Sequence, residues 1–290
     1  MSCRQCFSGG VHDHAEPTGH EEVKHGKTCY IAEAPANEAH GKPTIICITD
    51  AFGLKLINNK LLADAYARKT GCRVIVPDIV PGGPASLSLI DSLHQFSQPV
   101  AWYDVFGQVR RLIAGIGVLW VLIPFLRRAN PPKSYPVVLQ FVRAVRNELP
   151  LGTKLGVAGF CWGGYASTRL CMEFDSSVPT NKRLIDAQFC AHPSGLTLPQ
   201  MVVDAISAKV PYCMAIGDRD VVVRKTEVEN LEAAIRQTVG VSSSANPYEI
   251  RSYEGCTHGF AVRAHPDDKH EMQCSELAKD QATEWFKKYL

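Results

Sequence analysis

The chain has 290 residues, of which 46% are hydrophobic, and a formal net charge of +2. This length and apolar content are typical of one large folded domain or two small ones, and they exclude a disordered chain. Lysine and arginine are scattered rather than clustered, which argues against nucleic acid as a partner. The 11 cysteines, together with an N-terminus that lacks an apolar stretch, predict a reduced, cytoplasmic protein.

Residues 1–26 are polar, and we expect them to form a segment packed on the body of the protein. Cys3 and Cys6 are followed by histidines at positions 12, 14, 20 and 25, which leaves a metal-binding tail open as a second interpretation. A structural zinc site needs four ligands at regular spacing, and no second Cys-x-x-Cys or fixed histidine pair completes such a set. We therefore expect no metal.

From residue 27 onward, short apolar runs alternate with helical patterns. The strand-like runs are 29–32, 45–49, 72–76, 155–160, 187–191, 212–216 and 248–252, and the helical patterns include 59–69, 135–147, 225–239 and a closing helix at 269–289. Continuous apolar strands that alternate with helices predict an α/β protein with a mostly parallel central sheet and helices on both faces. No linker interrupts the pattern, so we expect residues 27–290 to form a single domain.

The span from residue 81 to residue 132 breaks this rhythm, and we interpret residues 83–135 as an insertion that shapes the substrate site. It contains an apolar run at 112–126, with a pair of arginines on each side. Crossing a bilayer takes about 20 apolar residues, and this run is shorter and contains a proline. We expect a buried or lid helix and no stable membrane insertion, with membrane contact as the other interpretation.

The segment Gly159–Gly164 reads Gly-Phe-Cys-Trp-Gly-Gly and joins the strand-like run at 155–160 to a helical stretch at 165–172. Strand, glycine turn and helix form the setting of the nucleophile elbow of α/β-hydrolases, here with cysteine in place of serine. The helix N-terminus favours the thiolate, which is the reactive form of cysteine. We predict that Cys161 is the nucleophile; the alternative is a buried structural cysteine beside a glycine turn.

A base and an acid for this cysteine follow later in the chain. His258 lies in a glycine-rich loop after the last strand-like run, and Asp220 follows the run at 212–216. Their order, nucleophile then acid then histidine, is that of α/β-hydrolases. Asp218 is the alternative acid, but the pattern Gly-x-x-Asp before apolar residues favours Asp220.

Acyl transfer also needs donors for the oxyanion that develops on the substrate carbonyl. The backbone N–H that follows the nucleophile belongs to Trp162. The loop after the strand-like run at 45–49 is placed to supply the second N–H, which we assign to Ala51.

These motifs resemble the dienelactone hydrolase family, particularly its fungal and eukaryotic branch. The matching segments are 49–53 with Asn58 and Asn59, 76–78, 159–164, 191–194, 217–220 and 258–263. They occur in the family's order and cover residues 27–290. The cysteine elbow together with His258-Gly-Phe-Ala is the most specific part.

The resemblance implies an α/β-hydrolase fold and a Cys–His–Asp triad that opens a cyclic enol ester through an acyl-cysteine, without a metal or organic cofactor. It also implies that Asp50 pairs with the resting cysteine and that Arg263 holds a substrate carboxylate. Two other functions stay open: a hydrolase of another acyl substrate, such as a secondary-metabolite ester or thioester, and a thiol-redox or binding module. We expect a monomer or homodimer that acts on a small-molecule ester or lactone.

Overall fold

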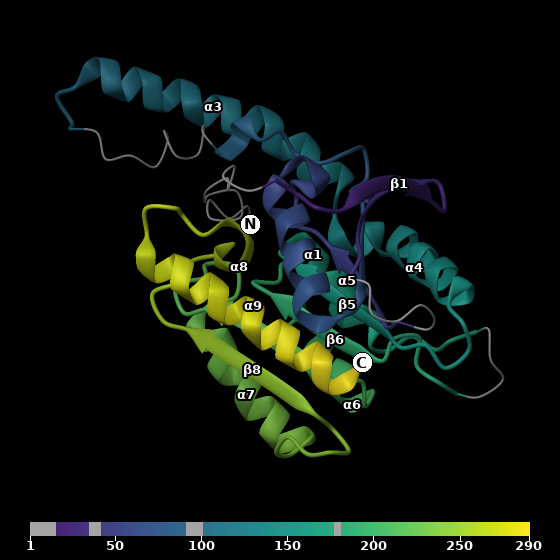
Figure 1. Cartoon of the computed structure of the whole chain (residues 1–290). Coiled ribbons are helices and arrows are strands. Elements are labelled where there is room, and N and C mark those ends of the chain that lie inside the picture. The colour runs from purple at the N-terminus through teal and green to yellow at the C-terminus, as the bar shows by residue number, and fades with distance from the viewer. Residues whose placement is uncertain (1–15, 35–41, 91–100, 177–180) are drawn as a thin grey trace.

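The computed structural model describes residues 16–34, 42–90, 101–176 and 181–290. Cys3, Cys6, His12 and His14 therefore lie outside the described residues. The described chain contains one eight-stranded sheet in the order β1-β2-β4-β3-β5-β6-β7-β8 (Figure 1). The strands are β1 His20–Lys24, β2 Lys27–Ala32, β3 Thr44–Ile48, β4 Arg73–Pro77, β5 Leu155–Phe160, β6 Ala187–Ala191, β7 Tyr212–Gly217 and β8 Tyr248–Tyr253.

The sheet is mostly parallel, as the sequence predicts. Strands β4, β3, β5, β6, β7 and β8 run parallel, and β2 joins them antiparallel through β4. All residues of β3, β5, β6 and β7 are buried, which explains their continuous apolar runs. Order and direction together confirm the α/β-hydrolase fold.

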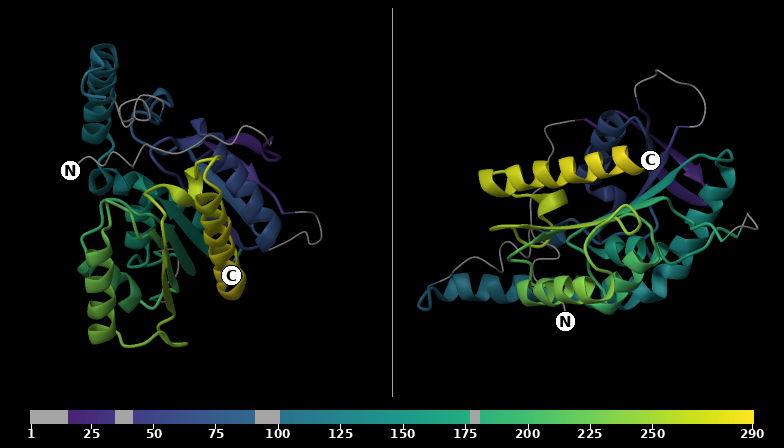
Figure 2. Two further views of the ribbon diagram at one scale, coloured as in Figure 1. Left: turned by 90° about the vertical axis from the view of Figure 1, so that its left-hand side faces the viewer. Right: turned by 90° about the horizontal axis from the view of Figure 1, so that it is seen from below.

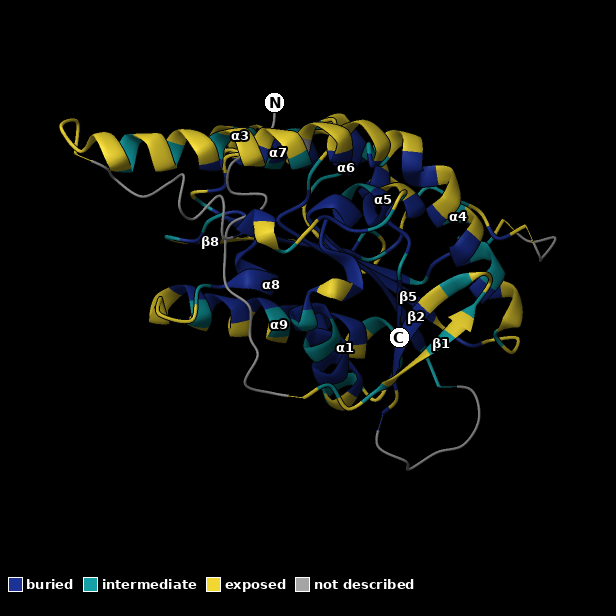
Figure 3. Ribbon diagram, turned by 90° about the horizontal axis from the view of Figure 1, so that it is seen from above, coloured by how far each residue is buried: buried dark blue, intermediate teal, exposed yellow. Residues whose placement is uncertain are grey.

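Helices cover both faces of the sheet (Figures 2 and 3). They are the short 3₁₀ helix η2 Gly53–Lys55 and the α-helices α1 Ile57–Thr70, α3 Val105–Arg128, α4 Pro131–Glu148, α5 Trp162–Leu170, α6 Gln200–Ser207, α7 Lys225–Thr238, α8 Phe260–Arg263 and α9 Lys269–Tyr289. Helices α1 and α9 contact each other on one face, while α4, α5, α6 and α7 form a contiguous layer on the other. The predicted closing helix is α9, and its Phe286 packs directly over Gly156 of β5, where a Cβ atom would come within 2.9 Å of the ring.

One strand was not predicted. Residues His20–Lys24, within the segment we expected to be polar and packed on the body, form β1 and pair antiparallel with β2 at the sheet edge. Their sequence, His-Glu-Glu-Val-Lys, shows no alternation of apolar and polar residues. An edge strand whose faces are mostly exposed can remain polar. Backbone hydrogen bonding, rather than apolar burial, specifies this strand.

The helix of the insertion differs from the expectation. Of the buried or lid helix that we expected, the buried form is wrong, because the outer face of α3 is exposed: Trp120 is 82% and Leu112 64% accessible (Figure 3). A lid role stays a prediction. The helix projects beyond the rest of the body in Figure 1. Only its inner face, which includes Val118 and Phe125, is buried. Hydropathy predicts an apolar helix, but it does not say whether a partner surface exists to cover every side of it.

Candidate active site

The turn between β5 and α5 places Cys161 in a conformation that L-residues rarely adopt. Its φ angle is +48° and its ψ angle −108°, and its backbone N–H donates to Ala191 O at 3.2 Å. Such strain at a strand-to-helix turn holds the side chain above the carboxyl end of the sheet, as in a nucleophile elbow. Cys161 is only 3% exposed. The predicted elbow geometry is therefore present.

The three glycines of the motif are required by close packing. A Cβ atom on Gly159 would lie 2.3 Å from Ser167 Oγ, and one on Gly164 would lie 2.5 Å from Pro193 Cβ. On Gly163 it would meet the backbone oxygen of Ile48 in β3 at 2.1 Å. These distances are far inside van der Waals contact. The motif is thus a packing requirement of the elbow as well as a signature of it.

His258 and Asp220 lie together at the ends of neighbouring strands. His258 Nδ1 is 2.8 Å from Asp220 Oδ2 and 3.0 Å from Oδ1, and both side chains are fully buried. Burial by itself would lower the pKa of His258. The negative charge of Cys161, aided by hydrogen bonds with Asp220 and Cys161, outweighs burial and raises this pKa to about 10. Since Nδ1 is engaged by Asp220, Nε2 is the ring nitrogen left to serve Cys161.

The two aspartates after β7 have different partners. Asp220 also accepts hydrogen bonds from the N–H groups of Val222 and Val223, at 2.7 and 3.3 Å. Asp218 Oδ1 instead accepts a hydrogen bond from Gly255 N at 2.7 Å. Asp218 therefore holds the loop that leads to His258, whereas Asp220 contacts the histidine itself.

The loop after β3 lies against the elbow. Gly163 N donates to Thr49 O at 3.2 Å, which joins the start of α5 to the end of β3. Ala51 and Trp162, the two residues assigned to the oxyanion site, flank this junction. The loop after β3 is where an α/β-hydrolase has its second oxyanion donor. The Trp162 ring is also held, because its Nε1 donates to Ala129 O at 2.7 Å, directly after α3.

Asp50 and Arg263 form a buried ion pair. Arg263 Nη1 donates to Asp50 Oδ2, and Asp50 Oδ1 accepts from Asn59 Nδ2 and Phe52 N, each at 3.1 Å. Burial raises the pKa of Asp50, Arg263 opposes that rise, and the neighbouring Cys161 adds to it. Asp50 is thus within electrostatic reach of the sulfur while its carboxylate is bonded to arginine. The roles that the resemblance implies for Asp50 and Arg263 remain predictions.

Two residues after β6 complete the surroundings of Cys161, and sequence reasoning did not assign them to the site. The ring of His192 stands edge-on to that of His258 with centroids 5.1 Å apart, and Ser194 Oγ is 3.9 Å from Cys161 Sγ. Burial lowers the pKa of His192 well below its usual value, so its ring is neutral. A sequence signal existed, since both residues lie in the segment 191–194 that resembles the family.

One group within the described ranges has the composition of a metal site. Cys256, His270 and Cys274 bring three ligand atoms within 4.8 Å of one another. His270 Nε2 is 2.7 Å from Glu254 O, so it already has a hydrogen-bond partner. A structural zinc site takes four protein ligands, and this group is one ligand short.

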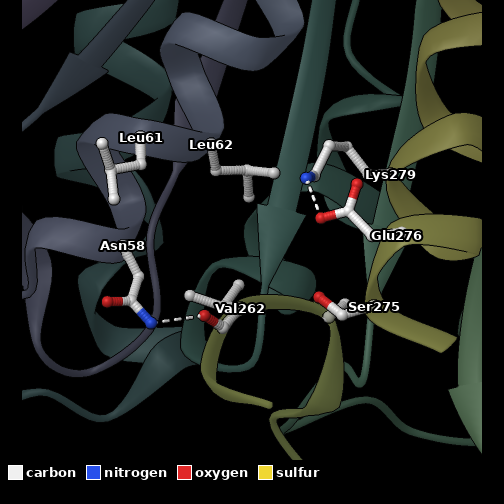
Figure 4. A pocket seen from close by; sticks show the side chains of 8 residues that line it. Asn58, Leu61, Leu62, Val262, Ser275, Glu276 and Lys279 are labelled. Atoms are coloured by element: carbon white, nitrogen blue, oxygen red, sulfur yellow. Dashed lines mark hydrogen bonds and ion pairs between the residues drawn. The ribbon is translucent and has the colours of Figure 1, made fainter. Parts of the chain in front are cut away.

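A cavity of about 70 Å³ lies behind the histidine loop, between α1 and α9 (Figure 4). Asn58 Nδ2 donates to Val262 O at 2.8 Å along its wall, and Lys279 pairs with Glu276 at 2.5 Å on the opposite side. Neither Cys161 nor His258 lines this cavity. The hydrogen bond from Asn58 joins α1 to α8, in the segment that follows His258.

Comparisons with known proteins agree with this architecture. The sequence profile of the dienelactone hydrolase family matches residues 136–290. The hydrolase pyvD of Aspergillus violaceofuscus is 25% identical, with 99% of this chain and 96% of that protein covered. The human carboxymethylenebutenolidase homolog is also 25% identical, with 93% and 90% covered.

Solved structures share the fold. An esterase from Thermogutta terrifontis superposes with a TM-score of 0.54 at 15% identity, covering 92% of this chain and 94% of that one. Carboxyl esterase 2 from Tuber melanosporum superposes with a TM-score of 0.52 at 13% identity, covering 97% and 90%. With the profile match over more than half of its residues, the chain belongs to the dienelactone hydrolase family.

Proposed function

We propose that this chain, a hydrolase of carboxylic esters or lactones, uses Cys161 as its nucleophile, His258 as its base and Asp220 as the residue that orients the base. The observation that carries the proposal is the buried contact between His258 and Asp220 beside a cysteine held at positive φ. The three residues follow β5, β8 and β7, whose carboxyl ends meet at one edge of the sheet. Ester hydrolysis by acyl transfer needs this combination of nucleophile, base and orienting acid.

In the first step the sulfur of Cys161 attacks the substrate carbonyl carbon and forms a C–S bond. The negative charge passes to the carbonyl oxygen, for which the N–H groups of Trp162 and Ala51 are the proposed donors. The intermediate then collapses, the C–O bond of the ester breaks, and His258 gives its proton to the leaving oxygen. The product is a thioester on Cys161.

In the second step a water molecule attacks the thioester carbon. His258, now neutral, accepts a proton from the water, and Asp220 stabilises the imidazolium that results. Breaking the C–S bond releases a carboxylic acid and restores the resting pair of Cys161 and His258. The high pKa of His258 suits this cycle, because it keeps the imidazolium beside the thiolate near neutral pH.

A cyclic enol ester is the substrate class that this site supports best. Its leaving oxygen is that of an enol, which is less basic than an alkoxide and departs more readily as it takes the proton from His258, and a thiolate nucleophile of modest basicity suits such a leaving group. The leaving group stays attached in a lactone, so both products of the ring opening remain one molecule. Arg263 is our candidate to bind a substrate carboxylate. It would do so either after its ion pair with Asp50 breaks or while that ion pair remains.

The test is to trap the acyl-enzyme on the full chain. With an activated ester such as 4-nitrophenyl acetate, intact-mass spectrometry should detect an acetyl adduct that maps to Cys161. Cys161→Ala should lose the adduct and turnover while keeping its fold. The matched control is Cys171→Ala, another buried cysteine, which should keep both. An adduct on any other residue, or full activity in Cys161→Ala, contradicts the proposal.

A second candidate is hydrolysis of a more lipophilic acyl ester or thioester. It is favoured by the hydrogen bond from Trp162 to Ala129, which ties the elbow to the end of the apolar helix α3. A panel of lactones and acyl thioesters separates the two candidates by the ratio of their kcat/KM values. In either case we propose a small-molecule substrate and a cytoplasmic enzyme.

A further inference from the structure

Helix α3 presents an apolar surface too large for an ordinary soluble monomer. Twelve large hydrophobic residues between positions 102 and 126 are exposed, and Trp102 and Phe106 are each 87% accessible. At roughly 100 Å² for a half-exposed large side chain, they present on the order of 1,000 Å². The largest apolar patch on a typical monomer is about 300–600 Å². This surface therefore needs an occupant.

One side of the helix packs on the body of the protein, although the helix also projects beyond it (Figure 1). Its inner face is buried through Ala114, Val118 and Phe125, which lie one and then two turns apart on the same side of the helix. Its C-terminal end is fastened by Arg128, which donates to Pro81 O and Gly83 O at 3.2 and 3.0 Å. By length and composition α3 could cross a membrane, but the core helix of a soluble protein can have the same length and composition. Because one side of α3 packs on the protein, its exposed side is suited to lie on a flat apolar surface rather than to cross a bilayer.

The charges on α3 distinguish between occupants. The helix contains no acidic residue, and it carries two arginine pairs, Arg110–Arg111 and Arg127–Arg128, at the two ends of its apolar run. Packing two copies of α3 face to face would bring arginines against arginines, with no carboxylate on either helix to neutralise them. A surface of anionic lipid headgroups complements the positive charge at both ends of the helix, with Arg110 and Arg127 as the proposed contacts, since Arg128 is already bonded to Pro81 O and Gly83 O.

The aromatic residues agree with that choice. The rings of Trp102 and Tyr103 pack edge-on just before the helix, with their centroids 5.7 Å apart, and Trp120 within the helix is 82% exposed. Tryptophan and tyrosine are enriched where a membrane meets water, because one end of each ring is apolar and the other polar. At about 1.5 Å per residue, the 24 residues of α3 give a contact about 36 Å long.

We propose that α3 docks the protein on an anionic lipid bilayer, lying in the plane of the interface with its exposed apolar face toward the acyl chains. Arginines at both ends bind lipid phosphates, and the helix does not cross the bilayer. The hydrogen bond between Trp162 and Ala129 places the end of this helix beside the nucleophile elbow. Docking therefore brings Cys161 close to esters dissolved in the membrane, although docking itself does not depend on catalysis.

The test is co-sedimentation of the full chain with vesicles of phosphatidylcholine alone or with added phosphatidylserine, at low and at high salt. We expect binding to the anionic vesicles, and at least about tenfold weaker binding for Trp120→Glu. Leu151→Glu is the matched control, because Leu151 is an apolar residue 94% exposed at another site. Arg110→Gln with Arg127→Gln should weaken binding about tenfold or more and reduce its salt dependence.

Two controls separate docking from folding and from the proposed catalysis. Trp120→Glu should keep the activity toward a soluble ester, and Cys161→Ala should bind vesicles like the unmodified protein. Failure of the unmodified protein to bind anionic vesicles at low salt overturns the proposal. The proposal is also overturned if light scattering detects a dimer that Trp120→Glu dissociates and the protein does not bind vesicles. In that case a second copy of the chain covers α3. Equal loss of vesicle binding in Leu151→Glu also overturns the proposal.

Discussion

Replacing Asp220 with asparagine removes one negative charge from the buried site and changes little else in its shape. In the structure His258 is wholly buried, and Asp220 lies 2.8 Å from its Nδ1 atom. Asparagine can still accept the hydrogen bonds of the Val222 and Val223 N–H groups through its oxygen. Its neutral amide cannot stabilise an imidazolium, and it admits the tautomer in which Nε2 carries the proton. In that tautomer Nε2 cannot accept a proton from Cys161.

The size of the effect follows from the role of Asp220 in the second step. The imidazolium that Asp220 stabilises forms during the second step, so losing the carboxylate raises the activation barrier. In a serine protease the same change in the triad lowers kcat about 10⁴-fold, and we expect a fall in kcat/KM of about 10²–10⁴-fold here. Burial opposes the charge on His258, so without Asp220 only Cys161 remains to raise its pKa. We therefore expect the pKa of His258 to fall below its present value of about 10.

The assay is kcat/KM for an activated ester as a function of pH, together with the rate at which iodoacetamide alkylates Cys161. Asp220→Asn should lower kcat/KM and move the alkaline limb of the profile to lower pH. Asp218→Asn is the matched control: Asp218 contacts Gly255 rather than His258, so it should change kcat/KM less than about tenfold. If Asp220→Asn keeps kcat/KM within about tenfold of the unmodified protein and leaves the alkaline limb unmoved, Asp220 does not orient or stabilise His258 during catalysis.

Three further predictions concern the stability of the site. Gly163→Ala places a Cβ atom 2.1 Å from a carbonyl oxygen of β3, so the Tm of this variant should fall by several degrees. The control is Gly117→Ala in α3, where a Cβ atom meets open space and Tm should stay unchanged or rise. Equal Tm shifts in the two variants would contradict the packing argument. The folded-state pKa of His258, about 10, exceeds its ordinary value of 6.5, so its contribution to stability is complete below about pH 6.5 and is lost as the pH rises to about 10. Urea unfolding across this range measures the slope, which should flatten in Cys161→Ala because the sulfur is the main cause that raises this pKa. Asp50→Asn leaves the Arg263 charge buried without its carboxylate, so it should reduce the free energy of unfolding by about 3–5 kcal/mol; a change below about 1 kcal/mol would show that the pair is not structural.

The parts of the fold that are specified locally could be predicted. Strands β3, β5, β6 and β7 are continuous apolar runs because both of their faces are covered, and such runs can be recognised from the sequence alone. The elbow could be predicted for a related reason: a strained turn between a strand and a helix requires glycines at fixed positions around Cys161. Strand β1 was missed because an exposed edge strand needs no apolar side chains.

Contacts between distant segments were harder to foresee. Asp50 and Arg263 were assigned separately, one as the partner of the resting cysteine and the other as a substrate ligand. The structure joins them in a buried ion pair across 213 positions of the chain. His192 was absent from the predicted site, although its ring lies 5.1 Å from that of His258. No local pattern encodes which two buried side chains meet.

The order of the chemical groups and the elements that hold them can be predicted from the sequence alone. Cys161, Asp220 and His258 each follow a strand-like run, and parallel strands bring such positions to one edge of a sheet. The ion pair of Asp50 with Arg263 and the exposure of α3 depend on contacts between distant parts of the chain. Burial depends on what packs against a side chain, and hydropathy along the chain contains no information about that partner. The apolar run at 112–126 therefore favoured a buried or lid helix, whereas the folded protein leaves the outer face of this helix exposed.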